Sequence, residues 1–355
     1  MRNRNYVNIS FVDVGQGDCI VLNWTKEDRT KGFGVIDCGN FSKSKYWFKG
    51  NDITCVDFVL VTHPHYDHYS GVLEMLNYFQ VNNIKVKEIW LTFLFSKKLL
   101  NKHNLSQDDF LNSLVYDNVH RKDLASLLKE IARRKEANES VIHALKEKSF
   151  HRLNNSLVIE FLSPNSIEAT STFIDTILDD TSKKLKSRLV DDHTTQNPNA
   201  NMLSSFLVLK HKNETLAVFT SDITTENKIH VFNRFGDDLV KAKLFQVPHH
   251  GSYNGFDIDS LDKLKRKEKC YAVISVGING YDLPKQEVVE YYKNNFKELL
   301  TTNKSSEIES TTTNLFRKNI SVLNLFNIDF SKQKTLDNTG TKSFSLSKNN
   351  CKYIR

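Results

Sequence analysis

Residues 62–71 read THPHYDHYSG and concentrate side chains that commonly bind metals: His63, His65, Asp67 and His68. Imidazoles and carboxylates are the ligands that proteins use for zinc, manganese and iron. Side chains at positions i and i+2 of an extended segment point the same way, so His63 and His65 can reach one ion together. Asp67 and His68 follow where the chain turns and can serve a second ion, and Asp67 can also orient a water molecule. The spacing therefore predicts a hydrolytic centre with two divalent ions, Zn²⁺ or Mn²⁺, rather than a histidine-rich surface loop.

The neighbouring segments predict how this turn is held. Residues 56–61 (VDFVLV) form an apolar run typical of a buried strand, and apolar residues recur at helical spacing through residues 72–79 (VLEMLNYF). The turn should therefore follow a strand at its carboxyl end, where ligand sites collect in α/β proteins. Asp37 ends another strand-like run, residues 33–38, and is expected to be a turn residue.

Two later segments offer further ligands. Asp222 follows the strand-like residues 215–220, and one carboxylate there can bridge two ions; the alternative is a cap for a helix that begins near Thr225. His249 and His250 follow a short strand within VPHHGS. Because adjacent side chains point in different directions, we expect only one of them to bind metal. We predict that His249 is the ligand and that His250 contacts the substrate or donates a proton.

The H-x-H-x-D-H pattern resembles the signature of the metallo-β-lactamase fold superfamily. Three further segments are similar, in the same order, to the extracellular hydrolase domain of ComEC-type competence proteins: residues 11–22 (FVDVGQGDCIVL), 247–252 (VPHHGS) and 273–284 (VISVGINGYDLP). The resemblance implies an α/β fold, the four-layer αββα sandwich, in which two mixed sheets pack face to face between helices. It also implies cleavage of phosphodiester bonds in DNA, with Asp222 at the strand end that carries the bridging aspartate.

One ligand position departs from the pattern of the superfamily. Another histidine usually precedes the bridging aspartate, and the corresponding residue here is Asn201. An amide oxygen is a harder and weaker ligand than imidazole, so the first ion should bind less tightly or favour manganese. His193, in the preceding polar loop, is the alternative ligand. Ser252 is a further candidate for contact with metal or substrate.

Changes in composition suggest how the chain is divided. Residues 1–330 are expected to form one hydrolase domain. Within it, residues 96–150 combine charge with helically spaced leucines and predict a mostly helical insertion, which offers a surface for a partner protein. Residues 331–355 are rich in lysine, serine and asparagine, and we expect a basic, poorly ordered tail.

The overall composition excludes several classes of protein. With 39% hydrophobic and 26% charged residues, the chain is typical of globular proteins. It contains no run of 18 apolar residues, so no membrane span is expected. The 5 cysteines form no C-x-x-C pair, which favours reduced thiols and a cytoplasmic location. The formal charge of +7 is compatible with a polyanionic partner but is mild.

These observations predict a metal-dependent hydrolase, in the first place a nuclease or phosphodiesterase acting on DNA or RNA. A hydrolase of a small ester, lactone, thioester or β-lactam is the alternative, since nothing in the loops around the site excludes it. A third hypothesis is a regulatory or interaction subunit of a multi-protein system, for example in defence against foreign DNA. The intact H-x-H-x-D-H pattern argues against it, because a degenerate relative would be free to lose ligands. The sequence leaves the oligomeric state open.

Overall fold

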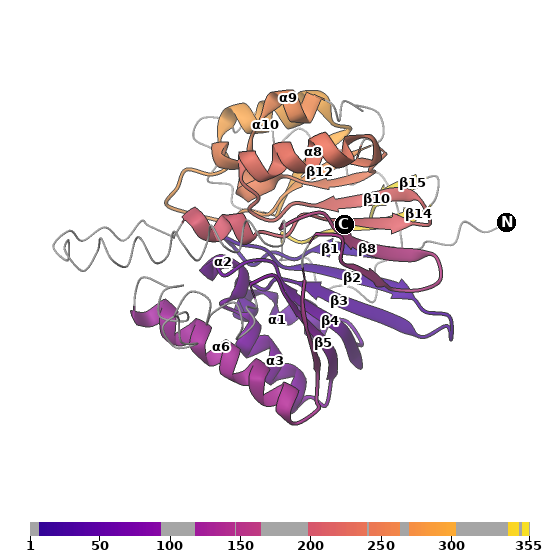
Figure 1. Cartoon of the computed structure of the whole chain (residues 1–355), viewed down its shortest axis with the longest axis vertical. Helices are drawn as coiled ribbons and strands as arrows, with labels where there is room; N and C mark the ends of the chain where they lie inside the picture. Colours follow the sequence, from indigo (N-terminus) through magenta and orange to yellow (C-terminus); the bar gives the residue numbers. More distant parts are fainter. Residues whose placement is uncertain are drawn as a thin grey trace.

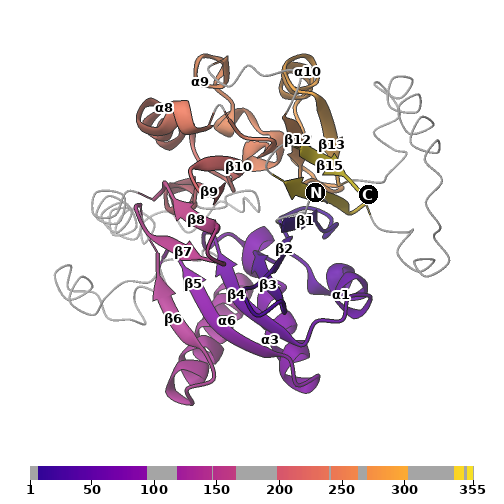
Figure 2. The ribbon, with the colours of Figure 1, turned by 90° about the vertical axis from the view of Figure 1, so that its right-hand side faces the viewer.

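Two β-sheets face each other in the computed structural model, which describes residues 7–93, 118–145, 147–164, 198–239, 241–262, 270–302, 340–347 and 350–354. Figure 1 shows that the first sheet is built mainly from the N-terminal part of the chain and the second from the later part. Figure 2 shows from another side that helices lie on the outer face of each sheet.

The first sheet has eight strands in the order β15-β14-β1-β2-β3-β4-β5-β6. They are β1 (Val7–Phe11), β2 (Ile20–Thr25), β3 (Lys31–Ile36), β4 (Cys55–Val61), β5 (Lys85–Leu91), β6 (Val141–Ala144), β14 (Lys342–Ser347) and β15 (Asn350–Tyr353). β3 and β4 are parallel, and Ile36 pairs with Leu60. The residues that follow these two strands, Asp37 and Thr62, therefore meet at one edge of the sheet.

The second sheet has seven strands in the order β13-β12-β11-β10-β9-β8-β7. They are β7 (Phe150–Arg152), β8 (Leu157–Phe161), β9 (Leu207–His211), β10 (Glu214–Phe219), β11 (Leu244–Gln246), β12 (Tyr271–Ile274) and β13 (Glu298–Thr301). β10 and β11 are parallel neighbours, with Val218 opposite Phe245. Their carboxyl ends therefore deliver Asp222 and the two histidines of VPHHGS to the same edge.

Helices complete the four layers. The apolar residues of α1 (Phe41–Lys49), α3 (Val72–Val81) and α6 (Asn118–Glu136) pack on the outer face of the first sheet. Those of α8 (Thr225–Leu239), α9 (Ile258–Asp262) and α10 (Gln286–Asn295) pack on the second sheet. The shorter elements are α2 (Tyr66–Tyr69) and the 3-10 helices η1 (Pro198–Leu203), η2 (Pro248–Gly251) and η3 (Tyr253–Gly255). The predicted αββα sandwich is confirmed.

The layer between the sheets is apolar and holds the sandwich together. Along β4, Phe58 and Leu60 face this layer, while Val59 and Val61 face the helices, so alternate residues of one strand serve two cores. Phe58 stacks on Trp90 of β5 with ring centroids 4.0 Å apart. Burial of this apolar surface is the main term that fixes the sheets, and through them the loops at their edge.

The expected tail is wrong for the residues that the structure describes. β14 pairs with the first strand of the chain, and β15 extends the same sheet. The alternation of Phe344 and Leu346 with serines explains the strand, since both apolar side chains are fully buried between the sheets.

Within the expected helical insertion, residues 96–150, the structure places the helix α6 but also the edge strand β6. Residues 96–117 and 146 of that segment lie outside the described residues. No helix in the described part of the chain has the length and apolar character to cross a bilayer.

Candidate metal centre

The H-x-H-x-D-H turn begins where β4 ends at Val61 and leads into α2 and α3. The imidazoles of His63 and His68 are inaccessible to solvent, and His65 is 5% exposed. The rings of His63 and His65 lie 4.7 Å apart, and those of His63 and His68 lie 4.2 Å apart. The predicted turn therefore brings its three imidazoles together below the surface.

The backbone of Asp67 is packed against the loops that precede it in the first sheet. Its carbonyl oxygen accepts a hydrogen bond from the Asp18 backbone N–H at 3.2 Å. A Cβ atom at either Gly17 or Gly39 would lie only 2.1 Å from the same oxygen. Only glycine fits at these two positions, so the VGQGD loop and the end of β3 hold the ligand turn in place.

A first group of ligand atoms comes from His63, His65 and Asp222, whose nearest nitrogen and oxygen atoms all lie within 4.8 Å of one another. His63 Nε2 is 3.9 Å from Asp222 Oδ2. Asp222 follows β10 and is 1% exposed. The structure therefore brings together residues from the two sheets, as the sequence predicts.

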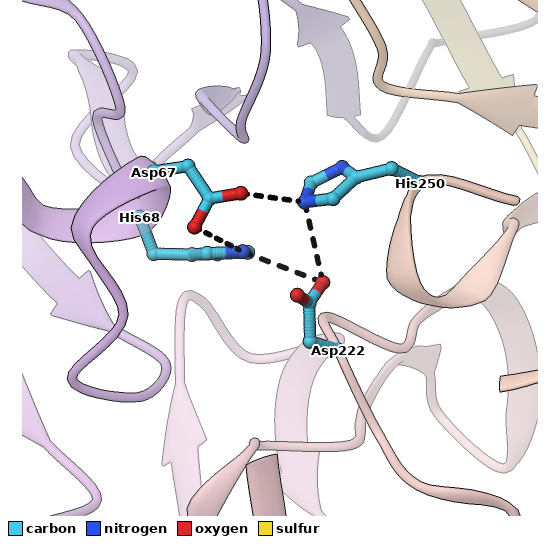
Figure 3. Close-up of side chains that lie close together, drawn as sticks. All are labelled: Asp67, His68, Asp222 and His250. Atoms are coloured by element: carbon cyan, nitrogen blue, oxygen red, sulfur yellow. Dashed lines mark ion pairs between the residues drawn. The ribbon is translucent and has the colours of Figure 1, made fainter. Parts of the chain in front are cut away.

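A second group consists of Asp67, His68, Asp222 and His250. Figure 3 shows the four side chains converging, two from the H-x-H-x-D-H turn and two from the second sheet. His68 Nε2 lies 3.3 Å and His250 Nε2 lies 3.4 Å from Asp222 Oδ1. His250 Nε2 is also 3.2 Å from Asp67 Oδ2. Asp222 thus belongs to both groups and presents one oxygen to each.

The structure differs from the predicted roles of the two adjacent histidines. His250, not His249, enters the second group of ligand atoms. His249 Nε2 lies 3.5 Å from Asp222 Oδ2, and its side chain is 15% exposed. Both residues have left-handed backbone conformations, with φ of 50° and 52°. In this turn the imidazole of His250 points inward and that of His249 stays at the rim, which is the opposite of the predicted roles.

A buried carboxylate holds the inner nitrogen of His68. Asp37 Oδ2 lies 2.7 Å from His68 Nδ1 and accepts a hydrogen bond from Thr62 Oγ1 at 2.6 Å. The Thr62 backbone N–H donates to Asp37 Oδ1 at 2.8 Å. Asp37 does have a turn conformation, with φ of 58°, but its carboxylate also orients His68 so that Nε2 faces the ligand group.

The Nδ1 atoms of His250 and His63 have hydrogen-bond partners of different strength. His250 Nδ1 lies 2.7 Å from the carbonyl oxygen of Ser275, which requires the proton on Nδ1. His63 Nδ1 is near two hydroxyl groups, Thr62 Oγ1 at 3.2 Å and Ser221 Oγ at 3.3 Å. In both histidines Nε2 is therefore the atom that faces the ligand group.

Gln246, at the end of β11, joins the two halves of the centre. Its Oε1 accepts hydrogen bonds from the backbone N–H groups of Thr220 and Ser221 at 3.0 and 3.2 Å. Its Nε2 donates to Asp18 Oδ2 at 2.7 Å, and that oxygen lies 3.7 Å from His68 Nδ1. The single buried amide therefore fixes the residues that precede Asp222 and the acid behind His68.

The polar atoms of this centre fit divalent cations. Several buried atoms have no hydrogen-bond partner among the described residues: His63 Nε2, His68 Nε2, His250 Nε2, Asp67 Oδ1 and both oxygens of Asp222. Buried polar atoms without partners are costly, and here they all converge on the two groups. Imidazole nitrogens and carboxylate oxygens at this spacing are a donor set for zinc or manganese.

The shifts in pKa within the centre also fit bound divalent cations. Burial opposes charge on His68 and His250, but nearby carboxylates, Asp222 foremost, raise the pKa of His68 well above its ordinary value and that of His250 to about 10. Burial also opposes charge on Asp222, yet the surrounding imidazoles hold its pKa well below the usual range. Without an ion, protons on the imidazoles compensate the negative charge of the carboxylates. Bound cations would supply this positive charge instead.

The three remaining candidates have different outcomes. Asn201 in η1 is 5% exposed, and its Oδ1 accepts no hydrogen bond from the described residues. His193 lies outside the described residues. Ser252 Oγ accepts the backbone N–H of Asn254 at 3.3 Å and caps η3.

The sequence gives unequal signals for the supporting residues. Asp37 ends a strand parallel to the one that carries the ligands, and this position could have suggested its contact with His68. Asp18 lies in the VGQGD motif, whose glycines indicate a turn but give no sign of a role for the aspartate. Gln246 stands in a short apolar strand, and no local pattern indicates its role.

The sequence was compared with families and curated proteins. A family model described as the metallo-beta-lactamase superfamily matches residues 12–129, which include both the VGQGD and the H-x-H-x-D-H segments. A search of the curated proteins found no match.

Three solved structures are among those similar to this chain. Igni18, a metallo hydrolase from the archaeon Ignicoccus hospitalis, is 12% identical over 83% of this chain and 95% of its own, with a TM-score of 0.41. YhfI, a metallo-beta-lactamase fold protein from Bacillus subtilis, is 11% identical over 84% and 97%, with a TM-score of 0.41. A long form RNase Z from yeast is 8% identical over 76% of this chain and 37% of its own, with a TM-score of 0.40. The match to the metallo-beta-lactamase superfamily model is limited to residues 12–129, and the αββα architecture agrees with it.

Proposed function

We propose that the protein is a metal-dependent phosphodiesterase that cleaves DNA or RNA with the help of two divalent ions. The observation that carries the proposal is the position of Asp222 between two groups of ligands. Its Oδ2 lies 3.9 Å from His63, and its Oδ1 lies 3.3 Å from His68 and 3.4 Å from His250. One carboxylate that faces both groups suits a pair of ions a few ångströms apart.

The side chains divide into two sets that would hold these ions. The first set is His63, His65 and Asp222, with Asn201 as a further oxygen ligand. The second set is Asp67, His68, Asp222 and His250. When bound, two divalent ions supply a water of lowered pKa and positive charge for the oxygens of a phosphate group.

Two of the surrounding side chains reach the open side of the centre. The side chains of Asp67 and His249 are each 15% exposed, more than the other groups around Asp222. Asp67 is placed to accept a hydrogen bond from the attacking water and orient it. His249, beside Asp222 but outside the second set, is placed to give a proton to the leaving oxygen.

The choice of nucleic acid as substrate follows from the ComEC-like segments, which meet at the centre. VGQGD contributes Asp18 behind His68, and VPHHGS contributes both His249 and His250. A two-ion centre matches phosphodiester cleavage, in which charge on the attacked group must be neutralised. The net charge of +7 supports a polyanionic substrate without requiring it.

The test is hydrolysis of defined substrates by the metal-loaded protein. Single- and double-stranded DNA and RNA are incubated with the wild type in Mn²⁺ or Zn²⁺, beside a panel of chromogenic esters and lactones. His65→Ala removes a ligand of the first set, and His230→Ala replaces a histidine of α8 outside the centre.

We expect cleavage of nucleic acid by the wild type and by His230→Ala, and loss of cleavage in His65→Ala and in chelator. Ester hydrolysis without cleavage of any nucleic acid would favour the small-ester alternative. Nuclease activity that survives His65→Ala would show that the activity does not come from this centre.

A further inference from the structure

Two exposed tyrosines lie on loops next to the turn that carries His250. Tyr253 is 47% exposed and follows the VPHHGS segment directly. Tyr281 is 48% exposed and lies in the loop after β12. This loop packs on the histidine turn, because a Cβ atom at Gly251 would lie 2.5 Å from Pro284 Cβ, and the Lys285 backbone N–H donates to Gly251 O at 3.0 Å. Both tyrosines therefore belong to loops that pack against each other next to the histidine turn.

The turn that carries Tyr253 is firmly held. Thr225 Oγ1 donates to the carbonyl oxygen of Asn254 at 2.8 Å. Lys228 Nζ donates to the carbonyl oxygen of Gly255 at 2.8 Å, and the lysine is inaccessible to solvent. Burial lowers the pKa of Lys228 to about 8, so the chain bears the cost of burying an amine to fix this turn.

The loop that carries Tyr281 is also fixed, by the side chain of Asn279. Asn279 Nδ2 donates to the carbonyl oxygens of Gly277 and Leu283 at 2.9 and 3.0 Å. Asn279 Oδ1 accepts the backbone N–H groups of Tyr281 and Leu283 at 3.0 and 3.1 Å. One amide therefore satisfies both sides of the loop, and the Tyr281 backbone is set before any ligand arrives.

Large aromatic side chains are enriched where proteins bind their partners. Neither ring belongs to the buried cores of the sandwich. Preformed aromatic faces bind flat ligands at a low cost in conformational entropy. Tyr66, inside the ligand turn, adds a third ring at the rim with 39% of its surface exposed.

The depth of the centre decides which nucleic acid these rings can bind. The ligand side chains other than Asp67 are at most 5% exposed, so a phosphate group must reach below the surface to contact them. In a duplex, each base is stacked between its neighbours and offers no free face. A single strand can bend its backbone toward the buried ligands and lay its bases on aromatic side chains, which is how proteins bind single strands without reading sequence.

We propose that Tyr253 and Tyr281 form a base-stacking platform that makes single-stranded nucleic acid the substrate. The proposal rests on the phosphodiesterase function proposed above and names its substrate class. The bases on either side of the scissile phosphate stack on the two rings, while the phosphate enters the centre beside His250.

Binding is measured first, on full-length protein in chelator, so that nothing is cleaved. A fluorescent oligothymidylate serves as the single-strand probe, and a hairpin of equal length serves as the duplex probe. The variants are Tyr253→Ala with Tyr281→Ala, the corresponding Tyr→Phe pair, and Phe150→Ala. Phe150 is 65% exposed on the edge strand β7, away from the β10 and β11 strands that carry the centre.

We expect the single strand to bind at least about tenfold more tightly than the hairpin, and the double alanine variant to lose about 10- to 100-fold in affinity for it. The phenylalanine pair should stay within about twofold of the wild type, because the ring faces remain, and Phe150→Ala should have no effect. Equal binding of hairpin and single strand, or wild-type affinity in the double alanine variant, would overturn the platform.

Cleavage assays in Mn²⁺ separate this proposal from the function on which it rests. If the platform is correct, the double alanine variant raises KM for single strands and keeps kcat within a few-fold. Cleavage of duplex and single strand with equal kcat/KM would overturn the platform and leave the phosphodiesterase in place. Absence of any phosphodiester cleavage by the wild type would overturn the function itself.

Discussion

The two ligand groups share Asp222 but are supported unequally. Behind the second group stand a carboxylate and a carbonyl oxygen, each 2.7 Å from an imidazole nitrogen of His68 or His250. Among the described residues, two hydroxyl groups stand behind His63 in the first group, at 3.2 and 3.3 Å. Charged and strong acceptors raise the basicity of a ligating imidazole and fix its orientation. The second ion should therefore bind more tightly than the first.

Asp222→Asn should have the largest effect, because it removes the residue common to both groups. We expect the loss of both ions and a fall in phosphodiester hydrolysis of at least about 1,000-fold. Elemental analysis after gel filtration measures the metal content, and Asp259→Asn on α9 serves as the control for loss of an acid. Retention of one tightly bound ion would mean that the two groups are independent of Asp222.

Asp37→Asn tests the inequality directly. The amide keeps the shape of the side chain but removes the negative charge behind His68, so the second ion should bind about 10- to 100-fold more weakly. Ser221→Ala removes a hydroxyl behind His63 and should weaken the first ion by no more than about tenfold. Calorimetric titration with Mn²⁺ resolves the two affinities. The comparison fails if both variants weaken the same ion, or if Asp37→Asn weakens neither.

Gln246→Leu should displace side chains of both ligand groups slightly and should lower the stability of the fold by a measurable amount. It leaves the backbone N–H groups of Thr220 and Ser221 and the Asp18 carboxylate without their partner, at about 1–3 kcal/mol for each buried group left unsatisfied. Urea unfolding of the metal-free protein should show a loss of at least about 3 kcal/mol. Gln286→Leu, on the exposed face of α10, should change stability by less than about 0.5 kcal/mol. Equal stability of Gln246→Leu and Gln286→Leu would contradict the bridging role of Gln246.

The smallest effect concerns the pH dependence of stability through Lys228, which supports the turn beside His250. Its pKa is about 8 in the folded protein against 10.5 ordinarily, so the unfolded chain binds more protons between these values. This group therefore makes the protein more stable as pH rises through that window. Lys228→Met should lack this contribution, so the wild type gains on the variant between about pH 8 and pH 10. The free energies of unfolding of the wild type and of Lys228→Met are measured against pH by urea unfolding in chelator. Two curves that run parallel would contradict a buried neutral amine.

Much of the first half of the centre can be predicted from the sequence, because its residues are contiguous. The strand, the turn and the helix around His63 and His68 follow from local apolar patterns. Asp222 can be placed by its position at the end of a strand, but its contact with both groups depends on how the sheets pack. The choice between His249 and His250 depends on two left-handed residues that no local pattern indicates.

The less predictable features share one physical cause, which is that they depend on contacts between distant segments. Gln246 acts through Asp18, which is 228 positions away. The C-terminal strand β14 looks like a polar tail by composition, although Phe344 and Leu346 alternate as they do in a half-buried strand. Period-two patterns in short polar segments therefore carry more information than composition does.

The central claim is that Asp222 joins two ion sites and that both are needed for hydrolysis. The most direct measurement is a titration of the metal-stripped wild type with Mn²⁺, in which bound ions and cleavage of a single-stranded oligonucleotide are followed together. We predict two ions per chain with distinct affinities, and cleavage that appears only as the weaker site fills. Full cleavage with one ion per chain, or two ions bound without any cleavage, would contradict the account.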